Sequence, residues 1–415
     1  MSSLSINYIQ KFLLYLMPIS IVLSSFVADL SLVIISILFL TRLINKEVFK
    51  NYYQNKFFLF FIFWCIYLIF SSLLSENIYL SLESSLFYFR FGIFSLAVFY
   101  LLNKYQYLEN NFSLMIGVVL LVVILDALFS FFYGYNLLGY KYNNYRLSGF
   151  FDDEWVLGSF LVRLFPLALI SFPYFKNKNI SNYILIIALI LLDITVILSG
   201  ERVACFYLIL FNLIFIFLIA KLQKILLIKN LFSILFITLL LIIYPSKKER
   251  LIDFTIEQMN LIGSKIIIVS PQHQSHYITA WEMIKNKPFF GYGPKSFRLI
   301  CAKDEFKHIE GCSTHPHNTY MQLFAETGIV GLLPVLFVFI FINLIFIKQL
   351  FYRIYKNQSY YKSNYLIILS CIYISLWPLA PAGNFFHNWL SIIYYLPIGF
   401  FLFYFKNKNY INKNI

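Results

Sequence analysis

Long apolar segments recur along almost the whole chain, and they limit what it can fold into. They lie at residues 12–28, 30–44, 57–74, 86–102, 113–133, 156–175, 183–199, 203–220, 226–244, 318–347, 364–380 and 386–405. A helix that spans a bilayer needs about 20 mostly apolar residues, and 60% of the residues here are hydrophobic while 13% are charged. This pattern predicts an all-α polytopic membrane protein with about twelve transmembrane helices.

The distribution of charge predicts the orientation in the membrane. A net charge of +14 would suit a nucleic-acid partner, but the basic residues cluster in every second loop, at 42–56, 176–178, 221–229, 348–362 and 406–413. Lys and Arg near span ends mark cytoplasmic loops. We therefore expect both termini in the cytoplasm, membrane lipid around the protein and no nucleic-acid partner. The first apolar run lacks a small-x-small cleavage site, and we expect it to be retained as a span.

The same reasoning divides the chain into three parts. Residues 1–244 hold the first nine expected spans, residues 245–317 form one large periplasmic loop with short helices, and residues 318–415 hold three spans and a cytoplasmic tail.

Polar residues in the spans gather toward one side of the membrane. Ionisable side chains are costly in a bilayer and mark sites by default. With this topology, Arg90, Asp126, Arg163, Asp193, Glu201, Arg202, Glu326 and all six histidines fall in outer loops or outer halves of spans. We expect a shared polar cavity that faces outward. The alternative is a set of separate ion pairs, such as Arg163 with Asp126.

The large loop has a pattern of its own. Residues 275–286 have apolar side chains at helical spacing, at Tyr277, Ile278, Trp281 and Ile284. An aromatic-glycine turn follows at 289–294, and we expect a second short helix from 295 to about 306.

Two of the five cysteines, Cys301 and Cys312, lie in this loop. In an oxidising compartment they can form a disulfide, worth on the order of 3 kcal/mol for a loop of roughly ten residues. The alternative is a zinc site made of His273, His276, His315, His317 and the cysteines, but the histidine spacings match no standard structural zinc pattern. We expect no metal and no cofactor.

Several motifs together resemble the O-antigen ligase family. The segment 280–298 followed by His315-Pro316-His317-Asn318 is similar to that family, and His317, Asn318, Gly328 and Gly331 fit its pattern of His, then Asn, Ser or Gln, nine residues and Gly-x-x-Gly. The turn at 198–202 resembles its Ser-Gly-x-Arg turn, and 145–150 resembles its Arg-x-Ser-Gly motif. Many members have an arginine shortly before the position of Trp281, where this chain has His273 and His276.

The resemblance implies a periplasmic site in the bacterial inner membrane. The implied reaction moves a glycan from an undecaprenyl diphosphate carrier to an acceptor hydroxyl, with lipid A-core as the expected acceptor. His317 is the expected general base, near the amide groups that open a helix. Arginine forks suit the diphosphate, and the expected diphosphate ligands are Arg202, Arg146, Arg90, Arg298 and His276. The expected supporting residues are His315, Asn318, Gln322, Glu326, Gly328 and Gly331. Glu326 is expected to be the partner of an intramembrane arginine, and the two glycines either allow close helix packing or serve the reaction.

Three other functions remain open on the sequence alone. An O-antigen polymerase would use the same donor chemistry, and so would an enzyme that glycosylates a protein hydroxyl. A transporter or flippase is less favoured, because its polar residues would lie near the midplane and on both sides of it.

Overall fold

A computed structural model describes residues 3–143, 145–174, 178–260, 269–407 and 410–412. Every regular element in these ranges is helical. The long helices are α1 (Ser3–Leu23), α2 (Ser25–Leu40), α4 (Lys56–Leu73), α6 (Phe89–Lys104), α7 (Leu108–Tyr133), α8 (Leu157–Ala168), α9 (Lys178–Leu198), α10 (Arg202–Leu218), α11 (Ala220–Ile243), α14 (Pro271–Asn286), α16 (Thr319–Tyr355), α17 (Ser363–Ser375) and α18 (Asn388–Lys406). Short helices are η1 (Thr41–Ile44), α3 (Lys46–Val48), η2 (Phe49–Tyr53), α5 (Ile78–Ser85), η3 (Gly149–Phe151), η4 (Leu169–Tyr174), α12 (Pro245–Lys248), η5 (Glu249–Asp253), α13 (Phe254–Asn260) and α15 (Phe297–Ile300).

The expected class of fold is confirmed. In the described part of the chain, nine helices are long and apolar enough to cross a membrane, and shorter apolar helices lie at Leu157–Ser171, Arg202–Leu218 and Ser363–Ser375. Each of these twelve helices overlaps one of the apolar segments of the sequence. The protein is therefore an all-α polytopic membrane protein, and twelve spans stays a prediction.

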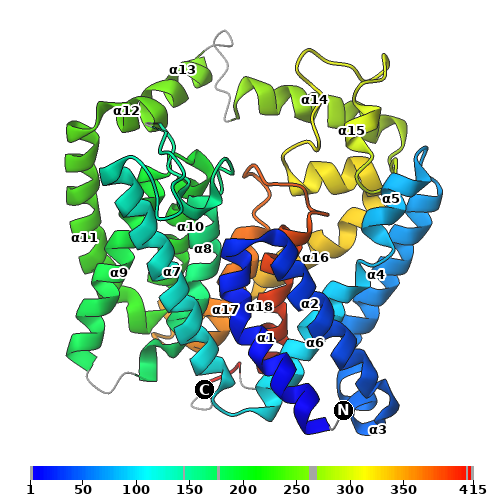
Figure 1. The fold of residues 1–415 in the computed structure, drawn as a ribbon, viewed down its shortest axis with the longest axis horizontal. Helices are drawn as coiled ribbons and strands as arrows, with labels where there is room; N and C mark the ends of the chain where they lie inside the picture. The colour runs from blue at the N-terminus through cyan, green and yellow to red at the C-terminus, as the bar shows by residue number, and fades with distance from the viewer. Residues whose placement is uncertain (1–2, 144, 175–177, 261–268, 408–409, 413–415) are drawn as a thin grey trace.

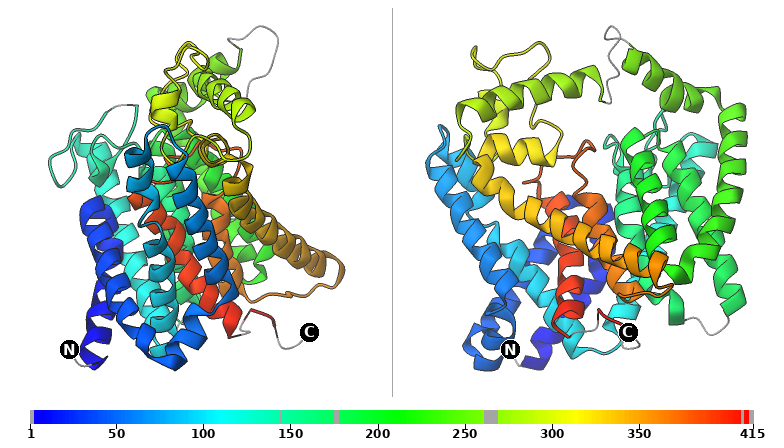
Figure 2. Two further views of the ribbon diagram at one scale, coloured as in Figure 1. Left: turned by 90° about the vertical axis from the view of Figure 1, so that its right-hand side faces the viewer. Right: turned by 180° about the vertical axis from the view of Figure 1, so that it is seen from behind.

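The two ends of the bundle differ in character. The N- and C-termini lie at one end, while α12 to α15 lie at the other, above the packed spans (Figure 1). Residues 261–268 of the large loop, Lys176 and Lys413 fall outside the described ranges. The long helix α16 crosses the bundle obliquely and leaves it at its far end (Figure 2).

The large loop has a small hydrophobic core. Ala280, Met283 and Ile284 of α14 pack with Phe297 and Ile300 of α15, with Ala325 of α16 among their neighbours. Helix α14 begins four residues before the expected start, because Pro271 takes its first position and the Ser270 side chain accepts a hydrogen bond from the His273 amide. The second helix is much shorter than expected, since only Phe297–Ile300 is helical and turns follow it.

The buried face of α14 differs in part from the predicted stripe. Ile284 is buried as predicted, but Trp281 is 50% exposed and Ile278 is 36% exposed. His276 and Thr279 are buried instead, on the face that also carries Ala280 and Met283.

Buried charges in the spans also pair differently from the prediction. Arg163 of α8 donates to the Tyr207 hydroxyl at 3.1 Å, and the Asp126 carboxylate accepts from the Leu137 amide at 2.9 Å, so the Arg163–Asp126 pair given as the alternative to a shared cavity does not form. Lys229, counted among the cytoplasmic lysines, lies inside α11 and pairs with Asp193 of α9 at 2.7 Å. Both side chains are buried, and together they join α9 to α11.

Candidate active site

Two separate segments meet to place Arg146 and Arg202 together. The Leu147 amide donates to the Ser199 carbonyl at 3.3 Å, which joins the loop after α7 to the turn before α10. Gly200 in that turn has φ +66, and a Cβ there would collide with the Tyr145 carbonyl. The close approach therefore requires glycine, and it sets both arginines at the same end of the bundle.

A buried carboxylate fixes the same turn against α8. The Glu201 side chain accepts from the Gly158 amide at 2.6 Å and from the Ser159 amide at 3.3 Å, in the first turn of α8. Any Cβ at Gly158 would lie 2.6 Å from the Ser199 hydroxyl. Glu201 thus binds the amides at the N-terminus of α8. These bonds hold the turn that carries Arg202 in place.

The structure adds a third arginine, Arg250 of η5, which the sequence reasoning missed. Its side chain passes over Gly200, where a Cβ would lie 3.5 Å from the Arg250 Cγ. Burial lowers the pKa of Arg146 and the charges of Arg250 and Arg202 lower it further, while the nearby Glu201 carboxylate opposes this effect. None of the ion pairs between described residues involves these three arginines. Arg202 donates to the Gln258 side chain at 2.6 Å. We call Arg146, Arg202 and Arg250 the arginine cluster.

The other two expected arginines lie elsewhere. Arg90 pairs with Asp29 at 3.2 Å and stacks on Phe91, so its charge is already matched. Arg298 of α15 is close enough to His315 to lower the pKa of that imidazole. The structure therefore places neither one within the arginine cluster.

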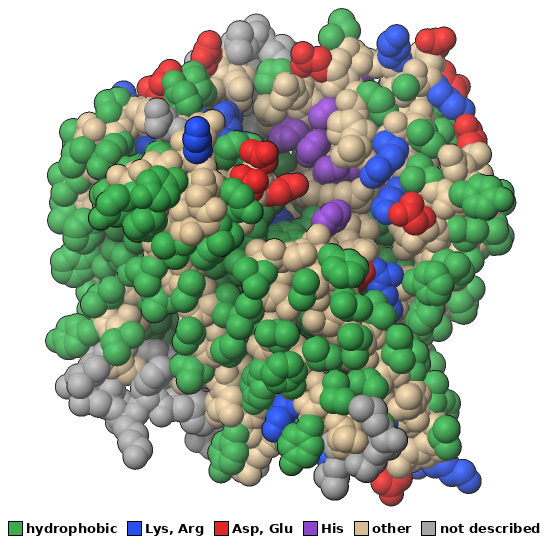
Figure 3. Space-filling model, viewed as in Figure 1, with side chains coloured by type: hydrophobic (Ala, Val, Ile, Leu, Met, Phe, Trp, Pro, Cys, Tyr) green, Lys and Arg blue, Asp and Glu red, His purple; other side chains and the backbone are tan. Residues whose placement is uncertain are grey.

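Three histidines gather around His317. The ring centroids of His273, His276 and His315 lie 5.2, 5.2 and 4.2 Å from that of His317. Two of these rings come from α14 and the others from the segment before α16. They line a hollow between the upper loops, with acidic side chains beside them (Figure 3). His276 is thus a neighbour of His317.

The segment between α17 and α18, residues 376–387, holds the histidines in place. The Ala382 amide donates to the His317 carbonyl at 2.9 Å, and His315 Nε2 lies 3.2 Å from the Ala382 carbonyl. His317 has φ +54, a left-handed conformation that is uncommon for a residue with a side chain. Sequence reasoning gave this segment no role, because its contribution is mostly backbone.

Burial and crowding keep these imidazoles neutral. Burial, followed by the charges of His315, His273 and His276, lowers the pKa of His317 to about 3. Burial is also the largest cause that lowers the pKa of His315 to about 4, and burial lowers the pKa of His273 and His276. At neutral pH these imidazoles are therefore uncharged.

Asn318 ends the histidine segment and begins α16. Its side chain accepts from the amides of Tyr320 and Met321 at 2.9 and 3.0 Å, and its amide group donates to the Pro378 carbonyl at 2.7 Å. Asn318 is thus the N-cap of α16. The expectation that these helix amides would serve an anion near His317 finds no support, because the Asn318 side chain already uses two of them.

Gln322 and Glu326 form a buried network below this cap. The Gln322 amide donates to Glu326 at 3.0 Å and to Asn384 at 2.9 Å, and its carbonyl oxygen accepts from the Phe385 amide at 2.9 Å. The Glu326 carboxylate accepts from the backbone amides of Lys295 and Phe297 at 3.0 and 3.1 Å. The expected arginine partner of Glu326 is therefore replaced by backbone amides, and the network joins α16 to both flanking loops.

The two glycines of the motif allow close approach of backbone. Gly328 has φ +64 and kinks α16, and a Cβ there would collide with the Phe289 carbonyl. The Gly331 carbonyl accepts from Trp64 Nε1 at 3.0 Å. Both contacts fix α16 against its neighbours.

Cys301 and Cys312 form a disulfide, with Cα atoms 5.1 Å apart. The bond closes the loop between α15 and the histidine segment. Within the described residues, no group of three His, Cys, Asp or Glu side chains has the geometry to hold a metal ion.

The fold and this site define a class: a polytopic helical membrane protein with arginines and neutral histidines at one end of its helical bundle. A comparison with protein families then identifies the group. A family described as O-antigen ligase matches residues 186–336, which include Arg202, Arg250, α14, His317 and Gly331. This part of the chain is similar to the O-antigen ligase family. No curated protein matches it in sequence.

Proposed function

We propose that this protein transfers a glycan from undecaprenyl diphosphate to an acceptor hydroxyl, with lipid A-core as the acceptor, at the periplasmic face of the inner membrane. The observation that carries the proposal is the arginine cluster, three guanidinium groups without an ion-pair partner among the described residues, beside neutral imidazoles. Burial of unpaired charge is costly, so such a cluster fits an anionic ligand. The fork geometry of arginine matches phosphate oxygens.

The arginine cluster binds the diphosphate next to His273. Electrostatic proximity supports this placement, since the Arg202 charge lowers the pKa of His273. In the transfer, the acceptor oxygen attacks the anomeric carbon and the bond from that carbon to the phosphate oxygen breaks. The leaving diphosphate gains negative charge, which the arginines stabilise.

His317 takes the proton of the acceptor hydroxyl. Ser313 donates its only proton to the His315 carbonyl at 2.8 Å, so the contact of 3.3 Å between Ser313 Oγ and His317 Nε2 uses a proton on Nε2. This tautomer leaves a lone pair on Nδ1 to accept the proton. The pKa of about 3 is low for a base, but an anionic diphosphate nearby raises the pKa of an imidazole. The donor thus activates the base when it binds.

A purified, reconstituted protein tests the proposed reaction. Proteoliposomes that receive undecaprenyl-diphosphate glycan and lipid A-core should produce glycan-bearing core, with and without EDTA. In a strain lacking the gene, core without glycan and long glycan on the carrier would agree with a ligase. Core with a single unit would indicate a polymerase, and movement of the carrier without a new glycosidic bond would contradict both.

A further inference from the structure

One fully buried lysine, Lys247, lies between the three segments that carry the arginine cluster. It belongs to α12, which follows α11 and lies at the end of the bundle opposite the termini (Figure 1). Its relative exposure is 0%, although lysine is rarely buried unless it is paired. The ion pairs found among the described residues do not include it. The position of Lys247 therefore depends on contacts with uncharged groups.

These contacts join α12 to the other two segments. Lys247 Nζ donates to the Leu198 carbonyl at 2.9 Å, at the end of α9 and directly before the turn that carries Arg202. A carbonyl in the last turn of a helix has no partner within that helix, and a cation there is favourable. Nζ also lies 5.0 Å from the ring centroid of Tyr142, in the loop that carries Arg146. One side chain therefore binds both segments at once.

The third arginine follows on the same helical segment. Arg250 lies three residues after Lys247, and side chains at this spacing are neighbours on one face of a helix. Lys247 contacts Leu198, and the side chain of Arg250 passes over Gly200, two residues further along the turn. One face of α12 and η5 therefore lies along the turn, and Lys247 anchors this face.

The protonation state of this lysine favours a positioning role over direct contact with an anion. Burial lowers the pKa of Lys247 to about 7, so at neutral pH a large share of the molecules carry the uncharged amine. An uncharged amine still has N–H groups that donate hydrogen bonds. Guanidinium groups, in contrast, stay charged and suit phosphate at any physiological pH. The bond to Leu198 is therefore available at pH values where the charge of Lys247 is not.

We propose that Lys247 is a positioning residue for binding of the donor. It holds the helical segment of Arg250 against the turn of Arg202 and the loop of Arg146, so that the three guanidinium groups share one diphosphate. The inference rests on the proposed glycan transfer and adds a residue that shapes the diphosphate site without touching the substrate. Loss of Lys247 should therefore weaken binding of the donor and leave binding of the acceptor unchanged.

Donor affinity in two variants of Lys247 tests this role. Lys247→Met removes the hydrogen-bond donor, and Lys247→Gln keeps a donor without the charge. With undecaprenyl diphosphate as the probe in native mass spectrometry, we expect Lys247→Met to bind about tenfold or more weakly than the wild-type protein, and Lys247→Gln to bind within about threefold of it. Wild-type affinity in folded Lys247→Met, or an equal loss in Lys247→Gln, would overturn the proposal.

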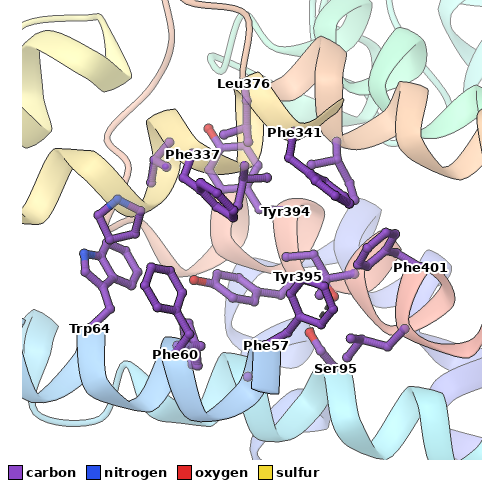
Figure 4. Close-up of a pocket in the computed structure, with 18 of the residues that line it drawn as sticks. Phe57, Phe60, Trp64, Ser95, Phe337, Phe341, Leu376, Tyr394, Tyr395 and Phe401 are labelled. Carbon is purple, nitrogen blue, oxygen red and sulfur yellow. Dashed lines mark hydrogen bonds between the residues drawn. The ribbon is translucent and has the colours of Figure 1, made fainter. Parts of the chain in front are cut away.

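Ser95→Ala is the matched control, because Ser95 is also a buried donor to a backbone carbonyl. Its hydroxyl donates to the Tyr395 carbonyl at 2.7 Å, on the wall of an apolar cavity between α4, α6, α16, α17 and α18 (Figure 4). The arginine cluster lies on other segments. We expect Ser95→Ala to bind the donor within about twofold of the wild-type protein. A loss as large as that of Lys247→Met would assign both effects to general destabilisation and overturn the proposal.

A double-mutant cycle tests whether Lys247 acts through the arginine cluster. The effects of residues that act through one another are not additive. Lys247→Met should therefore weaken donor binding by only about threefold or less when Arg250→Met is already present. The KM for lipid A-core in proteoliposomes should stay within about twofold in Lys247→Met. Additive losses from the two substitutions, or a raised KM for the acceptor, would overturn the proposal.

Tyr142→Leu provides a second variant if Lys247→Met does not fold. It removes the ring beneath the ammonium group and leaves the lysine in place. We expect about threefold weaker donor binding from loss of the cation–π contact, and unchanged binding would overturn the proposal. Failure of the wild-type protein to bind the donor would refute the proposed function, whereas loss confined to Arg202→Lys would refute the positioning role alone.

Discussion

The arginine half and the histidine half of the site use opposite electrostatic solutions. In the arginine half, permanent charges sit together without carboxylate partners among the described ion pairs, on turns fixed by Gly200 and Glu201. In the histidine half, burial and mutual repulsion keep the imidazoles neutral. The difference suggests a division of labour in which one half binds an anion and the other accepts a proton.

Removal of the central imidazole should have the largest effect. His317→Ala deletes the proton acceptor, and we expect the transfer rate to fall by about 10²–10⁴-fold, the usual range for general-base catalysis. The measurement is kcat in proteoliposomes, with His308→Ala as the control because His308 is exposed on the same loop. Full transfer by His317→Ala would contradict the role of the histidine half as the proton acceptor.

A smaller loss should follow a change in the arginine half. Arg202→Lys keeps the charge and loses the fork, and a lost charge-assisted hydrogen bond of about 1.5–3 kcal/mol corresponds to roughly 10–100-fold in kcat/KM. Arg353→Lys is the control, since Arg353 donates to the carbonyls of Ile216 and Phe217, away from the cluster. Equal kcat/KM in the two variants would contradict a forked contact with diphosphate.

Loss of the contact that fixes the tautomer of His317 should lower kcat modestly. Ser313→Ala removes the acceptor that holds the Nε2 proton, and loss of a hydrogen bond worth about 1 kcal/mol predicts a roughly fivefold lower kcat. Ser313→Thr keeps the hydroxyl and serves as the matched variant. If both variants transfer equally well, another group sets the tautomer.

Acid should destabilise the histidine half. The pKa values of the four imidazoles are lowered in the folded protein, to about 4 for His315 and about 3 for His317. Below pH about 6.5 the unfolded chain binds more protons than the folded protein. The contribution of these histidines to the free energy of unfolding is therefore fully present above that pH, and it is lost as the pH falls toward their lowered pKa values. The melting temperature in detergent should decrease between pH 7 and 5, and less so for His315→Asn. An identical decrease in that variant would assign the effect to other groups.

The sequence predicts the arginines that lie in local turn motifs, and it does not predict the one that lies outside such a motif. Arg146 and Arg202 lie in local motifs whose glycine and acidic residues determine the turn, and the structure brings these motifs together. Arg250 carries no such local pattern, and its place depends on packing against Gly200.

Two further predictions, the buried face of α14 and the position of Lys229, rested on sequence patterns that do not include long-range partners. The apolar stripe of α14 predicted its buried face only in part, because Ile284 is buried but His276 and Thr279 take the places expected for Ile278 and Trp281. The positive-inside pattern counted Lys229 with the basic residues of a cytoplasmic loop, but Lys229 lies within α11 and Asp193 provides a buried partner at 2.7 Å. Long-range pairing of this kind leaves no periodic signal in the sequence.

Binding of the donor, measured apart from transfer, tests the division between the two halves most directly. The affinity of undecaprenyl diphosphate should be measured by native mass spectrometry for the wild-type protein, His317→Ala and Arg202→Lys. We predict that His317→Ala binds within about twofold of the wild-type protein and that Arg202→Lys binds about tenfold or more weakly. Equal loss in both variants, or loss only in His317→Ala, would contradict the assignment of the diphosphate to the arginine cluster.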